Sequence, residues 1–160
     1  MNASVFYAGA LVLGAIYYAS PTVPCQSNIQ SALVRPALHA NTMHLIGNLT
    51  AFFILTRSIQ PRIGIFNYVL LIAFLWVTTA MMDVAFQQTC SIGFSGVVLG
   101  LLVWDLFDRG QLKWDLAAAG VLAAIWLEPM AQGQNNVSMS GHFYGLVAGL
   151  LATGLTRMVR

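Results

Sequence analysis

The stretch "SGHFYGLVAGLLATG", residues 140–154, is an apolar segment in which glycine recurs at every fourth position. The glycines are Gly141, Gly145 and Gly149. Residues four apart lie on one face of an α-helix, so this face carries almost no side-chain volume. Such a face lets a second helix approach closely, as is common between membrane helices. The stretch therefore predicts a helix that packs tightly against a partner.

A matching face occurs in "SIGFSGVVLG", residues 91–100, where Gly96 and Gly100 are also four apart. Taken alone, such glycines ordinarily indicate packing and nothing more. Here, however, Ser95 directly precedes the first glycine of one face, and His142 directly follows the first glycine of the other. If the two faces pack together, the serine and the histidine meet near one end of the helix pair.

The composition indicates a membrane protein. The chain has 160 residues, of which 58% are hydrophobic and 8% charged, and its mean hydropathy is +0.74. These values lie outside the range of soluble domains, and several apolar runs approach the roughly 20 residues that cross a bilayer. We expect an all-α integral membrane protein with one domain over residues 1–160. The expected spans are 4–19, 37–56, 64–84, 92–107, 114–130 and 139–156.

The basic residues predict the orientation. Six of them lie at one set of expected helix ends: Arg57, Arg62, Arg109, Lys113, Arg157 and Arg160. The positive-inside rule places that side, with both termini, in the cytoplasm, which leaves only Arg35 opposite. Since no lysine or arginine precedes the first span, we expect it to be retained and not removed as a signal peptide. The net charge of +2 is too small to indicate a nucleic-acid partner.

Two cysteines, Cys25 and Cys90, fall in expected loops on the side opposite the basic residues. An oxidising compartment would permit a disulfide between them. Two free thiols are equally compatible with the sequence, because no distance between them follows from it.

The second expected span, "ALHANTMHLIGNLTAFFILT", is interrupted by polar residues at His39, Asn41, His44 and Asn48. Polar side chains inside a membrane segment are by default a functional hypothesis. The alternative is that they form hydrogen bonds between helices and only hold the bundle together. His44 and Asn48 are four apart, so they share one helix face.

A serine hydroxyl becomes a nucleophile when a base within hydrogen-bond reach accepts its proton, and a neutral imidazole is the usual base. Ser95 and His142 are the candidates for these roles. Asp83 and Glu128 lie near expected loop ends, so neither is well placed to orient the histidine. We therefore predict a dyad.

Acyl transfer also needs donors for the oxyanion, and His44, Asn48 and the backbone N–H of Ser95 could supply them. A three-histidine metal site of His39, His44 and His142 is the other chemical interpretation. Within one helix, His39 and His44 would be splayed by about 140°, which disfavours this site. We expect neither a metal nor a cofactor.

Three motifs in this order, "HANTMHLIGN", "GFSG" and "GHFYGLVAG", resemble those of the rhomboid intramembrane serine proteases, over residues 35–156. The resemblance implies Ser95 as the nucleophile and His142 as the general base. It also implies further roles: oxyanion stabilisation by His44 and Asn48, a carbonyl near the site at Gly93, and a histidine nearer the surface at His39.

The resemblance further implies a six-helix bundle whose dyad lies in a water-filled cavity below the extracytoplasmic surface. Substrate helices would enter past the fifth helix, and "EPMAQGQNNVSMS", residues 128–140, would form a mobile lid. The segment "PTVPCQSNIQSALVRP", residues 21–36, departs from the family because it lacks the usual Trp-Arg pair. The compact chain is similar to the rhombosortase branch, and both that branch and a general rhomboid stay open.

The leading hypothesis is an endopeptidase that cuts single-span membrane proteins near the extracytoplasmic end of their helix, in a bacterial inner membrane. Two alternatives belong to other classes. One is an inactive rhomboid-like protein that binds membrane clients, and the other is a solute or proton pathway lined by His39, His44 and His142. The sequence indicates no particular oligomeric state.

Overall fold

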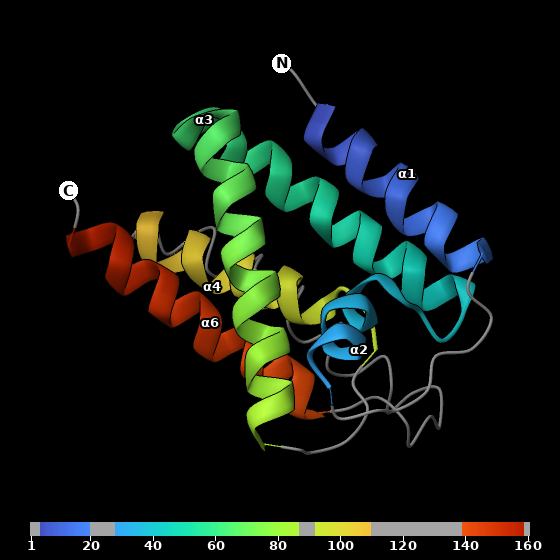
Figure 1. The fold of residues 1–160 in the computed structure, drawn as a ribbon. Coiled ribbons are helices and arrows are strands. Elements are labelled where there is room, and N and C mark those ends of the chain that lie inside the picture. Colours follow the sequence, from blue (N-terminus) through green and yellow to red (C-terminus); the bar gives the residue numbers. More distant parts are fainter. Residues whose placement is uncertain (1–3, 20–27, 87–91, 110–138, 159–160) are drawn as a thin grey trace.

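Helices make up nearly all of the chain that the structure describes. The structure is a computed structural model, and it describes residues 4–19, 28–86, 92–109 and 139–158. The elements are α1 (Ser4–Ala19), α2 (Ile29–Val34), the 3-10 helix η1 (Arg35–Ala37), α3 (Thr42–Phe86), α4 (Ser95–Arg109) and α6 (Met139–Met158). The expected all-α class is confirmed for these residues. Figure 1 shows their arrangement.

The start of α3 differs from the sequence prediction. A helix was expected from residue 37, but residues 35–37 form η1 and the α-helix begins at Thr42. Two local features cause this. Pro36 lies in the first turn of η1 and lacks the N–H that an α-helix interior needs. The side chain of Asn41 then caps α3, because its Oδ1 accepts a hydrogen bond from the backbone N–H of His44 at 2.8 Å.

A sharp bend at Gly64 divides the 45 residues of α3 into two limbs, which Figure 1 shows running in different directions. Gly64 has φ 79° and ψ 163°, a conformation that side chains other than glycine rarely adopt. Separate spans were expected at 37–56 and 64–84, with a loop between them. The structure instead continues the helix up to the bend, so this predicted loop was wrong.

The bend is attached to the carboxyl end of α4 by charged groups. Arg62 forms ion pairs with Asp105 and with Asp108, the latter at 2.7 Å. Ser58 donates a second hydrogen bond to Asp105, at 2.9 Å. These contacts hold the turn of α3 beside the last turns of α4.

By length and apolar composition, α3 is the one helix among the described residues that could cross a membrane, and Val5–Ala19 forms a shorter apolar helix. The expected fifth span, 114–130, lies outside the described residues. The number of spans therefore stays a prediction.

The central helix of the described bundle is α4. Every residue from 94 to 105 is buried, on all sides of the helix. A helix that is apolar all round is typical of a position surrounded by other helices. Its main neighbours are α3 and α6, which both pack against it. Residues at its amino end are consequently fixed by contacts from several elements.

The contact between α4 and α6 is made by backbone. A Cβ atom added to Gly145 would overlap the carbonyl oxygen of Gly96, and one added to Gly149 would lie 2.6 Å from the carbonyl oxygen of Gly100. No side chain fits at these positions unless the helices move apart. By contrast, an added Cβ at Gly154, on the same helix, would meet nothing within 4 Å.

We therefore expect Gly145→Ala to destabilise the bundle by about 1–3 kcal/mol, the range for overpacking a well-packed interior. The matched control is Gly154→Ala, for which we expect no loss, or a gain of up to about 1 kcal/mol from helix propensity. Thermal unfolding of the purified proteins in detergent measures the difference. Equal unfolding temperatures for the two variants would contradict the packing of α4 on α6.

Candidate active site

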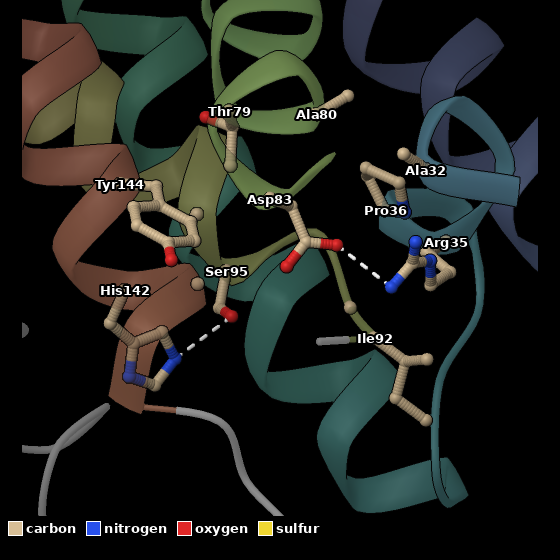
Figure 2. A pocket seen from close by; sticks show the side chains of 13 residues that line it. Ala32, Arg35, Pro36, Thr79, Ala80, Asp83, Ile92, Ser95, His142 and Tyr144 are labelled. Atoms are coloured by element: carbon tan, nitrogen blue, oxygen red, sulfur yellow. Dashed lines mark hydrogen bonds and ion pairs between the residues drawn. The ribbon is translucent and has the colours of Figure 1, made fainter. Parts of the chain in front are cut away.

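Ser95 and His142 lie in hydrogen-bond contact although they are on different helices. Ser95 is the first residue of α4, and His142 lies in the first turn of α6. The hydroxyl Oγ is 2.9 Å from Nε2 of the imidazole, and both residues are buried, at 7% and 3% exposed. Figure 2 shows the two side chains turned toward one another.

The glycines explain why the two side chains meet. An added Cβ at Gly96 would lie 3.0 Å from the carbonyl oxygen of Gly141. Gly96 directly follows Ser95, and Gly141 directly precedes His142. Because the backbones touch one residue away from each of them, a short hydroxyl can reach an imidazole across the helix interface.

The distance suits proton transfer. A serine hydroxyl that donates to a neutral imidazole nitrogen at 2.6–3.2 Å has the geometry of a nucleophile and its base. The pair at 2.9 Å lies within that range. Ser95 and His142 can therefore act together as a nucleophile and a proton acceptor.

His44 and Asn48 lie in the first turns of α3. Asn48 is buried, and its Nδ2 donates to the carbonyl oxygen of His44 at 2.8 Å. An amide nitrogen carries two N–H groups, so a second donor is left on Asn48 by this bond. The side chain is thus oriented by its own helix.

The ring of His44 lies against Gly93, two residues ahead of Ser95. A Cβ atom at Gly93 would come within 2.5 Å of Cε1 of His44. Gly93 also has φ 114°, a conformation that favours glycine. The loop before Ser95 can therefore approach His44 this closely only with glycine at position 93.

His39 lies beside the same loop. Its Nε2 accepts a hydrogen bond from the backbone N–H of Phe94 at 3.4 Å, and its Nδ1 lies 3.2 Å from the carbonyl oxygen of Ala37. The two contacts are compatible when the proton is on Nδ1, which then donates to Ala37. In this state His39 links η1 to the loop before Ser95.

The expected separation of His39 and His44 was wrong. Their rings lie edge to face with centroids 5.2 Å apart, not splayed to opposite sides of a helix. The reason is that α3 begins at Thr42, so the two residues do not belong to one helix. No three His, Cys, Asp or Glu side chains gather as a metal site in residues 4–19, 28–86, 92–109 and 139–158.

A small cavity of about 30 Å³ adjoins Ser95. Its walls include His142, Thr79, Asp83 and Tyr144 (Figure 2). A volume of this size holds a water molecule but no side chain. Polar residues from three helices therefore line one small space beside Ser95.

Asp83 and Arg35 form an ion pair at this cavity that the sequence analysis missed. Nη1 of Arg35 lies 2.8 Å from Oδ2 of Asp83, and both side chains are buried. Asp83 was expected near a loop end and Arg35 was treated only as the one basic residue on its side. The signal in the sequence was that two opposite charges were expected at the same depth.

Several sequence predictions lie outside the described residues. They concern Cys25 and Cys90, Glu128, the fifth span and the proposed lid up to residue 138. Of the glycines at the predicted packing faces, the structure places Gly96 and Gly100 on α4 and Gly141, Gly145 and Gly149 on α6, in mutual contact.

Two comparisons with known proteins name the same family. Residues 27–158 match the rhomboid domain. A protein of Acanthamoeba polyphaga mimivirus, provisionally named a rhomboid protein, is 30% identical over 155 residues, which cover 92% of this chain and 87% of the viral one.

Uncharacterized proteins of Mycobacterium tuberculosis and Mycobacterium bovis are 28% identical over 137 residues. The match covers 75% of this chain but 56% of the mycobacterial ones. The domain match spans most of the residues described above, including both helices that contribute Ser95 and His142. The chain belongs to the rhomboid family.

Proposed function

We propose that the protein is an intramembrane serine endopeptidase in which Ser95 is the nucleophile and His142 the general base. The observation that carries this proposal is the buried contact of 2.9 Å between Oγ and Nε2. Rhomboid proteins are integral membrane proteins, and the family as a whole supports intramembrane proteolysis. A buried serine and histidine in contact supply the chemistry that such an activity needs.

The reaction follows from the two groups. Oγ of Ser95 attacks the scissile carbonyl carbon while its proton passes to Nε2 of His142. The tetrahedral intermediate then collapses, the C–N bond breaks, and the imidazolium gives its proton to the leaving amine. Water, activated by the same imidazole, hydrolyses the acyl-enzyme and restores the hydroxyl of Ser95.

The oxyanion is stabilised by donors from two helices in this proposal. The backbone N–H of Ser95 is at the amino end of α4, where an α-helix leaves its first N–H groups without a partner in the helix. The side chains of His44 and Asn48 provide further donors. Support comes from the contact of the His44 ring with the loop that leads into Ser95.

The substrate is the transmembrane helix of another protein, cut near its extracytoplasmic end. Two arguments support this position. Ser95 and His142 are at the amino ends of α4 and α6, whereas the ion pairs of Arg62 lie at the carboxyl end of α4, on the side that the basic residues assign to the cytoplasm. A helix shields its own peptide bonds, so the substrate has to unwind before Ser95 can attack.

We further propose that both termini are cytoplasmic in a bacterial inner membrane. The amino end of α1, the bend of α3 and the carboxyl end of α6 lie at one end of the bundle in Figure 1, with α2 at the other. This arrangement agrees with the distribution of basic residues along the sequence.

Ser95→Ala should abolish cleavage of a single-span substrate and labelling by a fluorophosphonate, while the protein stays folded. Replacing a hydroxyl by hydrogen beside Gly96 leaves little empty space. His142→Ala should be comparably inactive, because a nucleophile and its base act as one unit. Cleavage assays in detergent, with circular dichroism as the control for folding, measure both. Retained turnover in folded Ser95→Ala would end the serine-protease assignment.

His44→Ala and Asn48→Ala should each lower the rate constant for cleavage by about tenfold to a thousandfold, the effect of removing one oxyanion donor. The Michaelis constant should barely change, because the donors act on a charge that develops only in the transition state. Steady-state kinetics with purified variants separate the two parameters. Wild-type rates in both variants would assign His44 and Asn48 to packing alone.

A further inference from the structure

The buried ion pair of Arg35 and Asp83 has no part in the reaction described above. It joins the segment ahead of α3 to the second limb of α3, with 2.8 Å between Nη1 and Oδ2. Burying two charges costs free energy that their attraction often fails to recover, so such a pair is weak evidence for added stability. Its position beside Ser95 therefore needs another explanation.

The segment of residues 35–39 holds the loop that leads into Ser95 at two consecutive points. The carbonyl oxygen of Arg35 accepts a hydrogen bond from the N–H of Gly93 at 3.1 Å. Nε2 of His39 accepts one from the N–H of Phe94 at 3.4 Å. Arg35 thus takes part twice, once through its side chain to α3 and once through its backbone to the loop.

The next backbone N–H along the chain is that of Ser95 itself. The N–H groups of Gly93 and Phe94 are engaged by the 35–39 segment. The Ser95 N–H is only one peptide unit further along the chain, so these two bonds limit how far it can move. The same loop geometry places the Cα of Ser95, and with it Oγ. A shift of the 35–39 segment would therefore move both the nucleophile and the oxyanion donor.

The opposite side of the loop is fixed by packing. The ring of Phe94 lies among those of Phe52 and Trp76, with centroids 5.1 Å and 5.6 Å away. Gly93 lies against the ring of His44. These contacts restrict the loop on one side. The hydrogen bonds from the 35–39 segment then restrict its movement on the other side.

We propose that the 35–39 segment, tied down by the Arg35–Asp83 ion pair, positions the loop of residues 93–94 so that Ser95 presents its hydroxyl and its N–H to the reacting carbonyl. This inference rests on the proposed function. Arg35 and Asp83 are positioning residues, since they act through the loop and touch no reacting atom.

The test replaces both charges at once. In Arg35→Leu/Asp83→Leu no unpaired charge is left in the interior, and such double replacements are often neutral for stability. The full chain is purified in detergent and inactivated with a fluorophosphonate, which gives a maximal rate constant of inactivation and a half-saturating concentration. Thermal unfolding is measured on the same samples. Thr153→Val, which replaces a buried hydroxyl on α6 away from the cavity and from the 35–39 segment, is the matched control.

We expect the double variant to keep its unfolding temperature and its half-saturating concentration, while its maximal rate constant falls by about tenfold to a hundredfold. A displacement of about 1 Å at a reacting group has an effect of this size. Thr153→Val should react as the wild type does. A double variant that is folded and reacts at the wild-type rate overturns the proposal, because the ion pair would then only hold the fold.

If the double variant does not fold, the His39→Leu variant tests whether the 35–39 segment positions the loop. It removes the acceptor for the Phe94 N–H and leaves the ion pair in place. A folded His39→Leu protein with a maximal rate constant at least tenfold lower supports the positioning role, and an unchanged constant overturns it. Wild-type labelling that Ser95→Ala does not abolish would contradict the proposed function itself. Ser95-dependent labelling that is equal in wild type and variant contradicts the positioning role alone.

Discussion

The described structure depends on the backbone contact between α4 and α6. Gly145 lies so close to the carbonyl oxygen of Gly96 that no side chain fits between the two helices there. Side-chain packing normally keeps helix axes about 8–10 Å apart, and small residues allow them to come nearer. The close approach at Gly96 and Gly141, each next to one of the two residues, brings the short side chain of Ser95 within hydrogen-bond distance of His142. The helix contact and the hydrogen bond of Ser95 with His142 are therefore consequences of the same glycines.

Charges are distributed around this contact in two separate groups. Arg62 with Asp105 and Asp108 holds the bend of α3 to the carboxyl end of α4. Arg35 with Asp83 holds the segment before α3 to the other end of its second limb. An unpaired charge in an apolar interior costs free energy. Asp83, Asp105 and Asp108 each form an ion pair with an arginine from a different part of the chain. The ion pairs thus join α3 to α4 at one end of the bundle and η1 to α3 at the other, where the glycine contact does not reach.

The sequence predicted the parts of the site that depend on helix periodicity. Glycines four apart indicated which faces meet, and that placed Ser95 near His142 before any distance was known. His44 and Asn48 were assigned to one face for the same reason, and both lie in the first turns of α3. Periodicity fails where a helix stops. The orientation of His39 was predicted wrongly because the cap at Asn41, a local hydrogen bond of 2.8 Å, excludes His39 from α3.

The pairing of Arg35 with Asp83 was missed for a different reason. The sequence indicated that the two charges lie at the same depth, but their contact also depends on how η1 returns onto the second limb of α3, which no local pattern shows. The helical conformation of residues 57–63 and the bend at Gly64 were similarly not predicted, because one glycine in a helical pattern is compatible with a continuous helix, a kink or a turn. Local rules thus predict the faces of helices, and the three-dimensional path of the chain decides which of their ends come together.

In the proposed mechanism, the same geometry constrains access to Ser95. Ser95 and His142 are both buried, and the cavity beside them, of about 30 Å³, is too small for a peptide. The helices α4 and α6 cannot separate to admit a substrate, because that movement would pull Oγ away from Nε2 and end the activation of the serine. The loop before Ser95 is equally unsuited to move, since it is held by Arg35, His39 and the ring of His44. The proposed function therefore implies that a substrate reaches Ser95 by displacing elements other than α4, α6 and this loop, so that Ser95 and His142 keep their positions while the path to them opens.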